Sequence, residues 1–181
     1  MDPLITLRKA TISDARFIAE NVLRALHIDE SDDSHIEHLA GISRREDTLY
    51  SWRNSTIALY NGVPAGMMVA YDGARYRRMR DITFPMIRIY VGDNYQSMDD
   101  EACAGEFYLD SLAVLPEYRH KGIASALIQD MLRQRDEAGI PLATIAVDPD
   151  NDTAYSLYTK NGFRKNGQIT VFNTTYDRLE R

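Results

Sequence analysis

Three basic residues lie directly before a glycine and an amphipathic stretch in the second half of the chain. Arg119, His120 and Lys121 precede Gly122. After the glycine, apolar residues recur at the spacing of one face of an α-helix, namely Ala124, Leu127, Ile128, Met131 and Leu132. The first turn of a helix presents backbone N–H groups without intrahelical partners, and a glycine lets an anion approach them closely. The segment therefore predicts an anion-binding site, with a capped helix and solvated basic residues as the alternative.

Other phosphate and metal motifs are absent from the sequence. No two glycines lie two residues apart and no Gly-Lys pair precedes Ser or Thr, which excludes the dinucleotide-binding and P-loop signatures. The chain also lacks His-Glu-x-x-His. His35 and His38, near His27, lie in an acidic stretch that is more typical of a solvated helix end than of a metal site. We therefore expect no metal.

Strands that alternate with helices position the anion-binding segment. In the second half, strands are predicted over residues 106–114 and 142–147, helices over 122–138 and 151–161, and two closing strands from Phe163 onward. Helices of this length between strands indicate an α/β (α+β) domain with parallel pairing in its middle.

The first half is predicted to contribute one strand, two helices and a hairpin. The predicted elements are a strand over 4–9, a helix from Ser13 or Asp14 to about 25, a helix over 34–44, and two strands over 56–60 and 63–71. Asn61-Gly62 between the last two supplies the residues that a tight primed turn needs. Residues 72–104 lack a clear period, so we expect an irregular insertion there, either a substrate loop or a surface excursion.

Composition favours a single globular domain over residues 1–181. Apolar residues make up 44% of the 181 residues, charged residues 27%, and the net charge is −6. No signal peptide or membrane span is indicated, so we expect a cytoplasmic protein without membrane partners. The acidic balance argues against nucleic acid as a partner, and the basic run 75–80 is more typical of a solvated turn. Cys103 is the only cysteine, and its acidic neighbours do not favour a thiolate.

Two segments of the second half match, in order, the motifs of one enzyme family. Arg119-His120-Lys121-Gly122-Ile123-Ala124 is similar to an Arg/Gln-x-x-Gly-x-Gly/Ala pyrophosphate motif. A second motif is matched by Asn151, Ala154, Leu157, Tyr158, Lys160, Gly162 and Phe163. On these residues the chain from Glu106 to about Arg178 resembles the GNAT superfamily of acyl-CoA N-acetyltransferases. His120 and Ala124 stand where the family often has glycine, which changes little for CoA binding.

The resemblance implies a fold and a co-substrate. It implies a GNAT-like domain whose central mixed sheet of about seven strands has a splayed parallel middle pair. It also implies binding of acetyl-CoA, with the pantetheine arm between the splayed strands and the strand amides polarising the thioester carbonyl. The cofactor-binding residues implied are Leu112, Ala113, Val114, Arg119, His120, Lys121, Gly122, Ile123, Ala124, Ser125, Asn151, Tyr155 and Tyr158.

Acetyl transfer to an amine needs a base and profits from an acid. An alkylammonium has a pKa near 10.4, so its neutral form costs about 4.6 kcal/mol at pH 7. Glu106, Asp110, Leu112 and Val114 share one face of a strand, which the resemblance makes the active-site face, so Asp110 and Glu106 are the candidate bases. Either carboxylate could instead orient the substrate or pair with an arginine. Tyr158 matches the family's acid.

Other readings of the same fold stay open. The chain could bind acyl-CoA as a regulatory module without catalysis, or transfer a longer acyl group. Its acceptor could be a small-molecule amine or the amine of a peptide or protein, and the sequence does not resolve which. Tyr155 lies one turn before Tyr158 and is a substitute for it as the acid. A homodimer is an expectation at the level of the family alone.

Overall fold

The computed structural model describes residues 4–26, 28–29, 31–92, 95 and 98–181, so His27 lies outside the described residues. The chain divides into two compact units. The first unit comprises Met1–Ala70 and Ser111–Leu127, and the second comprises Tyr71–Asp110 and Ile128–Arg181. No helix within the described ranges combines the length and the apolar character needed to cross a membrane.

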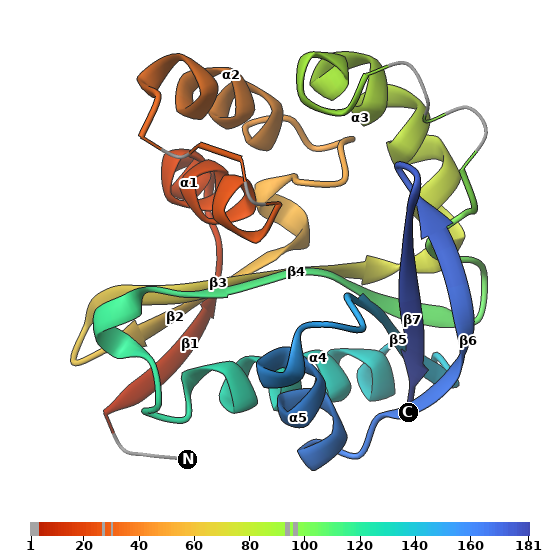
Figure 1. Ribbon diagram of the computed structural model, residues 1–181. Coiled ribbons are helices and arrows are strands. Elements are labelled where there is room, and N and C mark those ends of the chain that lie inside the picture. Colours follow the sequence, from red (N-terminus) through yellow and green to blue (C-terminus); the bar gives the residue numbers. More distant parts are fainter. Residues whose placement is uncertain (1–3, 27, 30, 93–94, 96–97) are drawn as a thin grey trace. The chain divides into compact units, whose positions relative to one another are not determined.

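The first unit places two helices on one side of three antiparallel strands (Figure 1). Its elements are β1 (Ile5–Lys9), α1 (Ala15–Ala25), α2 (Asp33–Ser43), β2 (Ser55–Tyr60) and β3 (Val63–Asp72), whose last residues enter the second unit. Asn61 and Gly62 have φ angles of 51° and 80° between β2 and β3. These positive φ angles are those of the primed turn that the Asn-Gly pair predicts, so the hairpin is confirmed.

The second unit contains most of the remaining elements. They are α3 (Tyr76–Val91), β4 (Glu106–Val114), α4 (Ile123–Glu137), β5 (Leu142–Val147), α5 (Asp152–Lys160), β6 (Arg164–Val171) and β7 (Thr174–Glu180), of which β4 and α4 each continue into the first unit. The predicted strands and helices of the second half are therefore confirmed to within a residue or two at their ends.

The strands follow the order β1-β2-β3-β4-β5-β7-β6 in one sheet of seven strands. Strands β4 and β5 pair in parallel, and their pairing covers Glu106–Leu109 against 142–145. Both strands continue beyond this pairing, β4 to Val114 and β5 to Val147. The α/β fold class with a parallel middle pair is confirmed.

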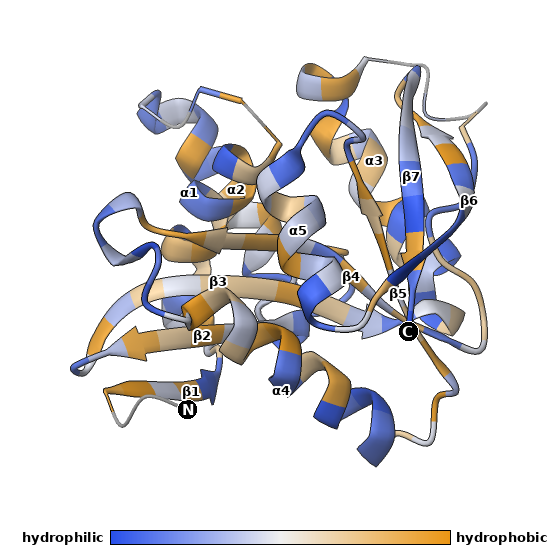
Figure 2. Cartoon of the chain, turned by 60° about the horizontal axis from the view of Figure 1, so that its bottom comes forward, coloured by the Kyte–Doolittle hydropathy of each residue, from blue (hydrophilic) through white to orange (hydrophobic). Residues whose placement is uncertain are grey.

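Helix α4 follows the predicted amphipathic pattern with one exception. Its apolar positions from Leu127 to Leu132 are buried, and hydrophobic and hydrophilic residues alternate along it in Figure 2. Asp130 is a charged residue between these apolar positions, yet it is buried, and Arg133 and Gln134 both donate hydrogen bonds to its carboxylate. A carboxylate that accepts such bonds can be buried at low cost.

The expectation of an irregular segment over 72–104 is wrong for much of its length. Residues Tyr76–Val91 form α3, the longest helix among the described residues. Met79, Thr83, Phe84 and Ile87 are buried along it at helical spacing. Four arginines and Pro85 within the helix hide this period in the sequence. The basic run 75–80 is accordingly the start of a helix and not a turn.

Candidate active site

The basic segment before α4 forms a sharply bent loop in the first unit. His120 and Gly122 have φ angles of 61° and 82°. The amide of Ala126 donates a 3.0 Å hydrogen bond to the carbonyl of Gly122, at the first turn of the helix. The amides of the preceding turn therefore lie at the helix start, where an anion is stabilised.

Gly122 suits this loop because a side chain at its positive φ would be strained. The space beside it is open, since a Cβ there would meet only the Cδ1 atom of Ile5, at 4.0 Å. The approach to the helix start is therefore open at this position. Arg119, His120 and Lys121 are all exposed beside it, and the Lys121 ammonium lies 5.4 Å from the centre of the Tyr60 ring. Cationic groups and free space thus meet at one helix start.

The second half of β4 is anchored on the side of β3. The amide of Leu115 donates a 2.9 Å hydrogen bond to the carbonyl of Ala65. The two strands are also close at Gly66, where a Cβ would lie 2.7 Å from the Ala113 carbonyl oxygen. Leu112 and Val114 are half-buried, whereas Ala113 is buried. This alternation is the one predicted for a strand with one face toward the site.

Helix α5 fixes Tyr158 in the second unit. The Asn151 side chain accepts the amide of Ala154 at 3.0 Å, which is the predicted N-cap. The Tyr158 ring packs edge-on against Phe163 with 6.1 Å between ring centres, and its residue is 7% exposed. Burial raises the pKa of Tyr158. Tyr155 is half-buried one turn earlier.

Asp110 occupies the position directly after the last paired residue of β4. Leu109 is the final β4 residue in register with β5, and Asp110 follows it. The hydroxyl of Tyr71 donates a 2.7 Å hydrogen bond to the Asp110 carboxylate. Asp110 is half-buried beside this donor.

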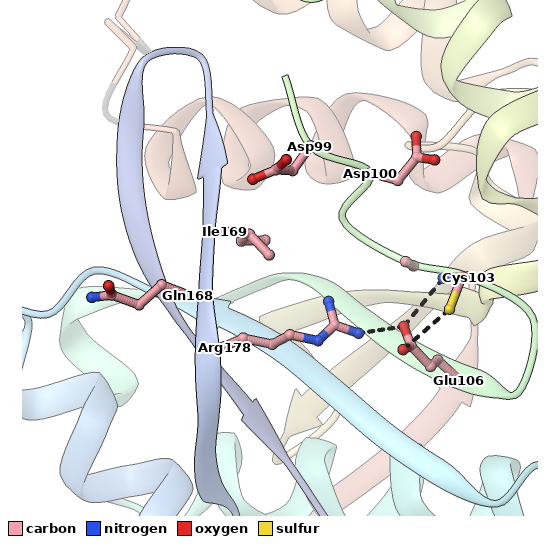
Figure 3. A pocket seen from close by; sticks show the side chains of 8 residues that line it. Asp99, Asp100, Cys103, Glu106, Gln168, Ile169 and Arg178 are labelled. Carbon is pink, nitrogen blue, oxygen red and sulfur yellow. Dashed lines mark hydrogen bonds and ion pairs between the residues drawn. The ribbon is translucent and has the colours of Figure 1, made fainter. Parts of the chain in front are cut away.

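Glu106, the other candidate base, is held in an ion pair. Its Oε2 lies 2.5 Å from the Arg178 guanidinium, and the side chains are 11% and 16% exposed. The amide and thiol of Cys103 also donate to it, at 3.1 and 3.3 Å (Figure 3). The same residues line a cavity of about 420 Å³ together with Asp99 and others. The Glu106 carboxylate is thus already engaged by a guanidinium, an amide and a thiol.

Cys103 shows the thiol chemistry that its acidic neighbours predict. Burial and the hydrogen bond to Glu106 raise the pKa of Cys103. The protonated thiol is therefore favoured, and the residue serves as a donor to Glu106 instead of a nucleophile.

Glu101 is a half-buried residue, absent from the sequence-based candidates, whose carboxylate accepts hydrogen bonds from two tyrosines. The hydroxyls of Tyr108 and Tyr76 donate to it at 2.9 and 3.2 Å. Burial, with repulsion from Asp110, raises the pKa of Glu101 to about 7. Burial also raises the pKa values of Tyr71, Tyr76 and Tyr108, so all three hydroxyls stay protonated and act as donors.

A weak signal for Glu101 does exist in the sequence. It belongs to the acidic run Asp99-Asp100-Glu101 before β4. Its partner Tyr108 lies two residues before Asp110 and therefore on the same face of β4. Its other partner, Tyr76, lies in the basic run whose helix was missed. Within the described ranges, no group of three or more His, Cys, Asp and Glu side chains is arranged to hold a metal ion.

Comparisons with known proteins identify one family and one fold. Residues 21–163 match the model of the Acetyltransferase (GNAT) family. No curated protein matches the chain significantly. Among solved structures, an N-acetyltransferase from Staphylococcus aureus Mu50 has a TM-score of 0.80 at 21% identity, over 97% of this chain and 100% of that one. A crystal structure described only as an acetyltransferase has a TM-score of 0.76 at 22% identity, over 97% and 98%.

A structure with bound coenzyme is similar as well. The PaiA N-acetyltransferase of Thermoplasma acidophilum, in complex with coenzyme A, has a TM-score of 0.58 at 18% identity over 98% of both chains. At these identities the structures establish the fold, whereas the family model establishes the kinship. Because that model covers well over half of the chain, the protein belongs to the GNAT family of acetyltransferases, a membership that supports acetyl transfer from acetyl-CoA in general.

Proposed function

We propose that this protein transfers an acetyl group from acetyl-CoA to a primary amine by direct attack of the amine on the thioester. The observation that carries the proposal is the start of α4, where a positive-φ glycine, an open approach and exposed cationic side chains coincide with the family's pyrophosphate motif. A pyrophosphate is the group that this combination suits. No covalent enzyme intermediate is required, since the amine is itself the nucleophile.

The cofactor-binding roles divide between two segments. Arg119 to Ser125 hold the pyrophosphate through backbone amides and cationic side chains. Leu112, Ala113 and Val114 offer backbone groups to the pantetheine arm, and their amides polarise the thioester carbonyl. Support for the second role comes from β4, which continues past its pairing with β5 and is anchored to β3.

Asp110 and Tyr158 supply the acid–base chemistry in this proposal. Asp110 is favoured over Glu106 because Glu106 is already paired with Arg178. Tyr158 gives a proton to the departing thiolate. Its ring is held edge-on against Phe163, which limits the positions that the hydroxyl can take. Its raised pKa makes it a weak donor, but a thiolate needs only a weak one because its conjugate acid has a pKa near 8.5.

The experiment is acetyl transfer to a fixed panel of amines, namely spermidine, kanamycin and a lysine-containing peptide. Transfer is followed as CoA thiol release and as the mass increase of the amine by one acetyl group. We expect equal amounts of both products with at least one amine. Thiol release without acetylated amine, or no release by a folded protein, would contradict the proposal.

A further inference from the structure

Two carboxylates and three tyrosine hydroxyls gather in the second unit. Tyr71 donates to Asp110, and Tyr76 and Tyr108 donate to Glu101, at distances of 2.7 to 3.2 Å. The rings of Tyr71 and Tyr108 lie 5.9 Å apart and join the two halves of the group. We call these five residues the tyrosine–carboxylate cluster. Tyr71, Tyr76 and Tyr108 are each 2% exposed or less.

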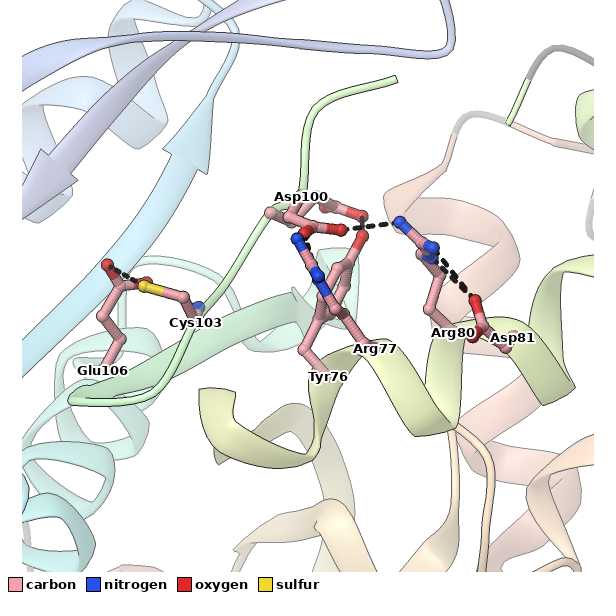
Figure 4. Close-up of polar contacts among 8 residues, drawn as sticks. Tyr76, Arg77, Arg80, Asp81, Asp100, Cys103 and Glu106 are labelled. Atoms are coloured by element: carbon pink, nitrogen blue, oxygen red, sulfur yellow. Dashed lines mark hydrogen bonds and ion pairs between the residues drawn. The ribbon is translucent and has the colours of Figure 1, made fainter. Parts of the chain in front are cut away.

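The segment that carries Glu101 is fixed from several sides. The Arg178 guanidinium donates 2.9 Å to the Glu101 carbonyl. The neighbouring Asp100 carboxylate lies between Arg77 and Arg80 of α3, at 2.5 and 2.6 Å (Figure 4). Gly73 packs so closely on the Cys103 carbonyl that a Cβ would lie 2.2 Å from it. Glu101 is thus held in place, which proton transfer to a defined atom requires.

The surroundings of Glu101 leave its charge only partly compensated. The titratable and charged groups that act on it are Tyr71 of β3, Tyr76 and Arg80 of α3, Tyr108 and Asp110 of β4, and Tyr176 of β7. Arg80 is already engaged by two aspartates, Asp81 and Asp100. Two carboxylates that repel each other in a partly desolvated site share a proton or attract a cation. A protonated amine is a cation and can also give the pair a proton.

We propose that Glu101, with Asp110 as its partner carboxylate, accepts the proton that the acceptor ammonium must lose before it attacks. This inference rests on the proposed function and deepens it, because it moves the base from Asp110 alone to the pair. It also sets the acceptor class as a cationic primary amine, which the charge of the pair attracts.

The proton balance of the step is complete. The ammonium gives one proton to Glu101, and its nitrogen then forms the bond to the thioester carbon while the bond to sulfur breaks. The sulfur takes a proton from Tyr158, which is restored by the second proton lost from nitrogen. Glu101 then returns its proton to solvent, so one ammonium and one thioester give one amide, one thiol and one released proton.

The test is the pH dependence of kcat/KM for wild type, Glu101→Gln, Asp110→Asn and the exposed control Glu137→Gln. An amine that the wild type acetylates is taken from the panel above, and acetyl-CoA binding is measured for each variant. We expect Glu101→Gln to bind acetyl-CoA normally and lose about 100-fold or more in kcat/KM. We expect Glu137→Gln to match the wild type.

The shape of the pH profile separates a base from a structural group. Asp110→Asn removes the like charge beside Glu101, so the acid limb of the remaining activity should move to lower pH. If Glu101→Gln keeps the activity, or keeps the wild-type acid limb, the proposed role of Glu101 is wrong although acetyl transfer stands. If the wild type binds acetyl-CoA but acetylates no amine, the proposed function fails, and this inference fails with it.

Discussion

Tyr158 has a buried ring and carries the hydroxyl that we propose as the proton donor, so a phenylalanine there removes one atom and little packing. We predict that Tyr158→Phe lowers kcat by about 10- to 100-fold, within the range of lost general acid catalysis, and leaves acetyl-CoA binding unchanged. Steady-state kinetics and calorimetry measure the two quantities. Tyr90→Phe on α3 is the matched control. Turnover within twofold of wild type would remove Tyr158 from the mechanism.

Asp14 contributes to stability through a bidentate ion pair with Arg8. Its carboxylate accepts two hydrogen bonds of 2.7 Å from that guanidinium, which lowers the pKa of Asp14 from 3.8 to about 2. Because the pKa of Asp14 is lower in the folded state than in the unfolded state, its charge stabilises the fold at pH values above the unfolded-state pKa. This contribution is lost as the pH falls from about 4 to about 2. We predict that Asp14→Asn costs about 1 kcal/mol at pH 7, after discounting for solvent screening.

Urea unfolding of the Asp14→Asn variant at several pH values checks this contribution. The gap in unfolding free energy between wild type and variant should close as the pH approaches 2. A gap of the same size at pH 7 and at pH 2 would show that packing, and not the charge, is responsible.

The geometry of single residues was predictable where it depends on neighbours in the sequence, and it was missed where it depends on residues far along the chain. Gly122 and Asn151 act on their own helix starts, so motif and spacing were enough to predict their geometry. Glu101 gains its properties from Tyr76 and Tyr108, which come from a helix and a strand on either side of it. No pattern within the acidic run 99–101 carries that information.

At the scale of elements, the start of α3 and the segment before β4 touch through their backbones. A Cβ on Gly73 would lie 2.2 Å from the Cys103 carbonyl oxygen, and a backbone atom cannot rotate away as a side chain can. We predict that Gly73→Ala lowers the unfolding free energy by about 2 kcal/mol, as overpacking does. Denaturant unfolding measures the change.

Gly41→Ala is the control for this substitution. Gly41 lies inside α2, and a Cβ there would meet nothing within 4 Å. Alanine is preferred over glycine in a helix interior, so this variant should gain about 0.5–1 kcal/mol. Equal effects of the two variants would mean that the close approach at Gly73 does not constrain the fold.

Elements were predictable in proportion to the clarity of their period. The β2–β3 hairpin has Asn61-Gly62 between two apolar runs, and α4 repeats its apolar residues every three to four positions. Helix α3 has the same kind of buried face, but Pro85 and the arginines around it obscure the period. A proline inside a helix is read from sequence as a break, and here the helix continues through it.

At the scale of the whole molecule, the half-buried Glu101 should make stability depend on pH near neutrality. Its folded-state pKa is raised above the unfolded value, so the folded chain holds this proton more tightly. Stability therefore falls as the pH rises from about 4.5 to about 7 and then levels off. Glu101→Gln cannot titrate, so it should lose this fall, which we expect to be about 3 kcal/mol.

Unfolding of wild type, Glu101→Gln and Glu137→Gln between pH 4 and pH 8 measures this effect without any acceptor amine. The advantage of Glu101→Gln over wild type should grow with pH across this window, and Glu137→Gln should follow the wild type. A constant difference between Glu101→Gln and wild type would mean that Glu101 has an ordinary pKa.

The alternating pattern of the second half predicted the α/β class with a parallel middle pair, and the family resemblance supplied the sheet of about seven strands, whereas the strand order is known from the structure alone. The acceptor was not, because no motif names it and its candidate residues come from β3, α3 and β4. Net charge does not replace that information, since a chain of charge −6 still presents a cationic loop to an anion.

Calorimetric titration with acetyl-CoA tests the central claim most directly, with wild type beside a double variant, Arg119→Glu with Gly122→Asp. The variant places two negative charges at the start of α4, where the pyrophosphate is proposed to bind. We predict tight binding by the wild type and none by the folded variant. Equal binding by both would place the coenzyme elsewhere, and no binding by the folded wild type would contradict the acetyltransferase account.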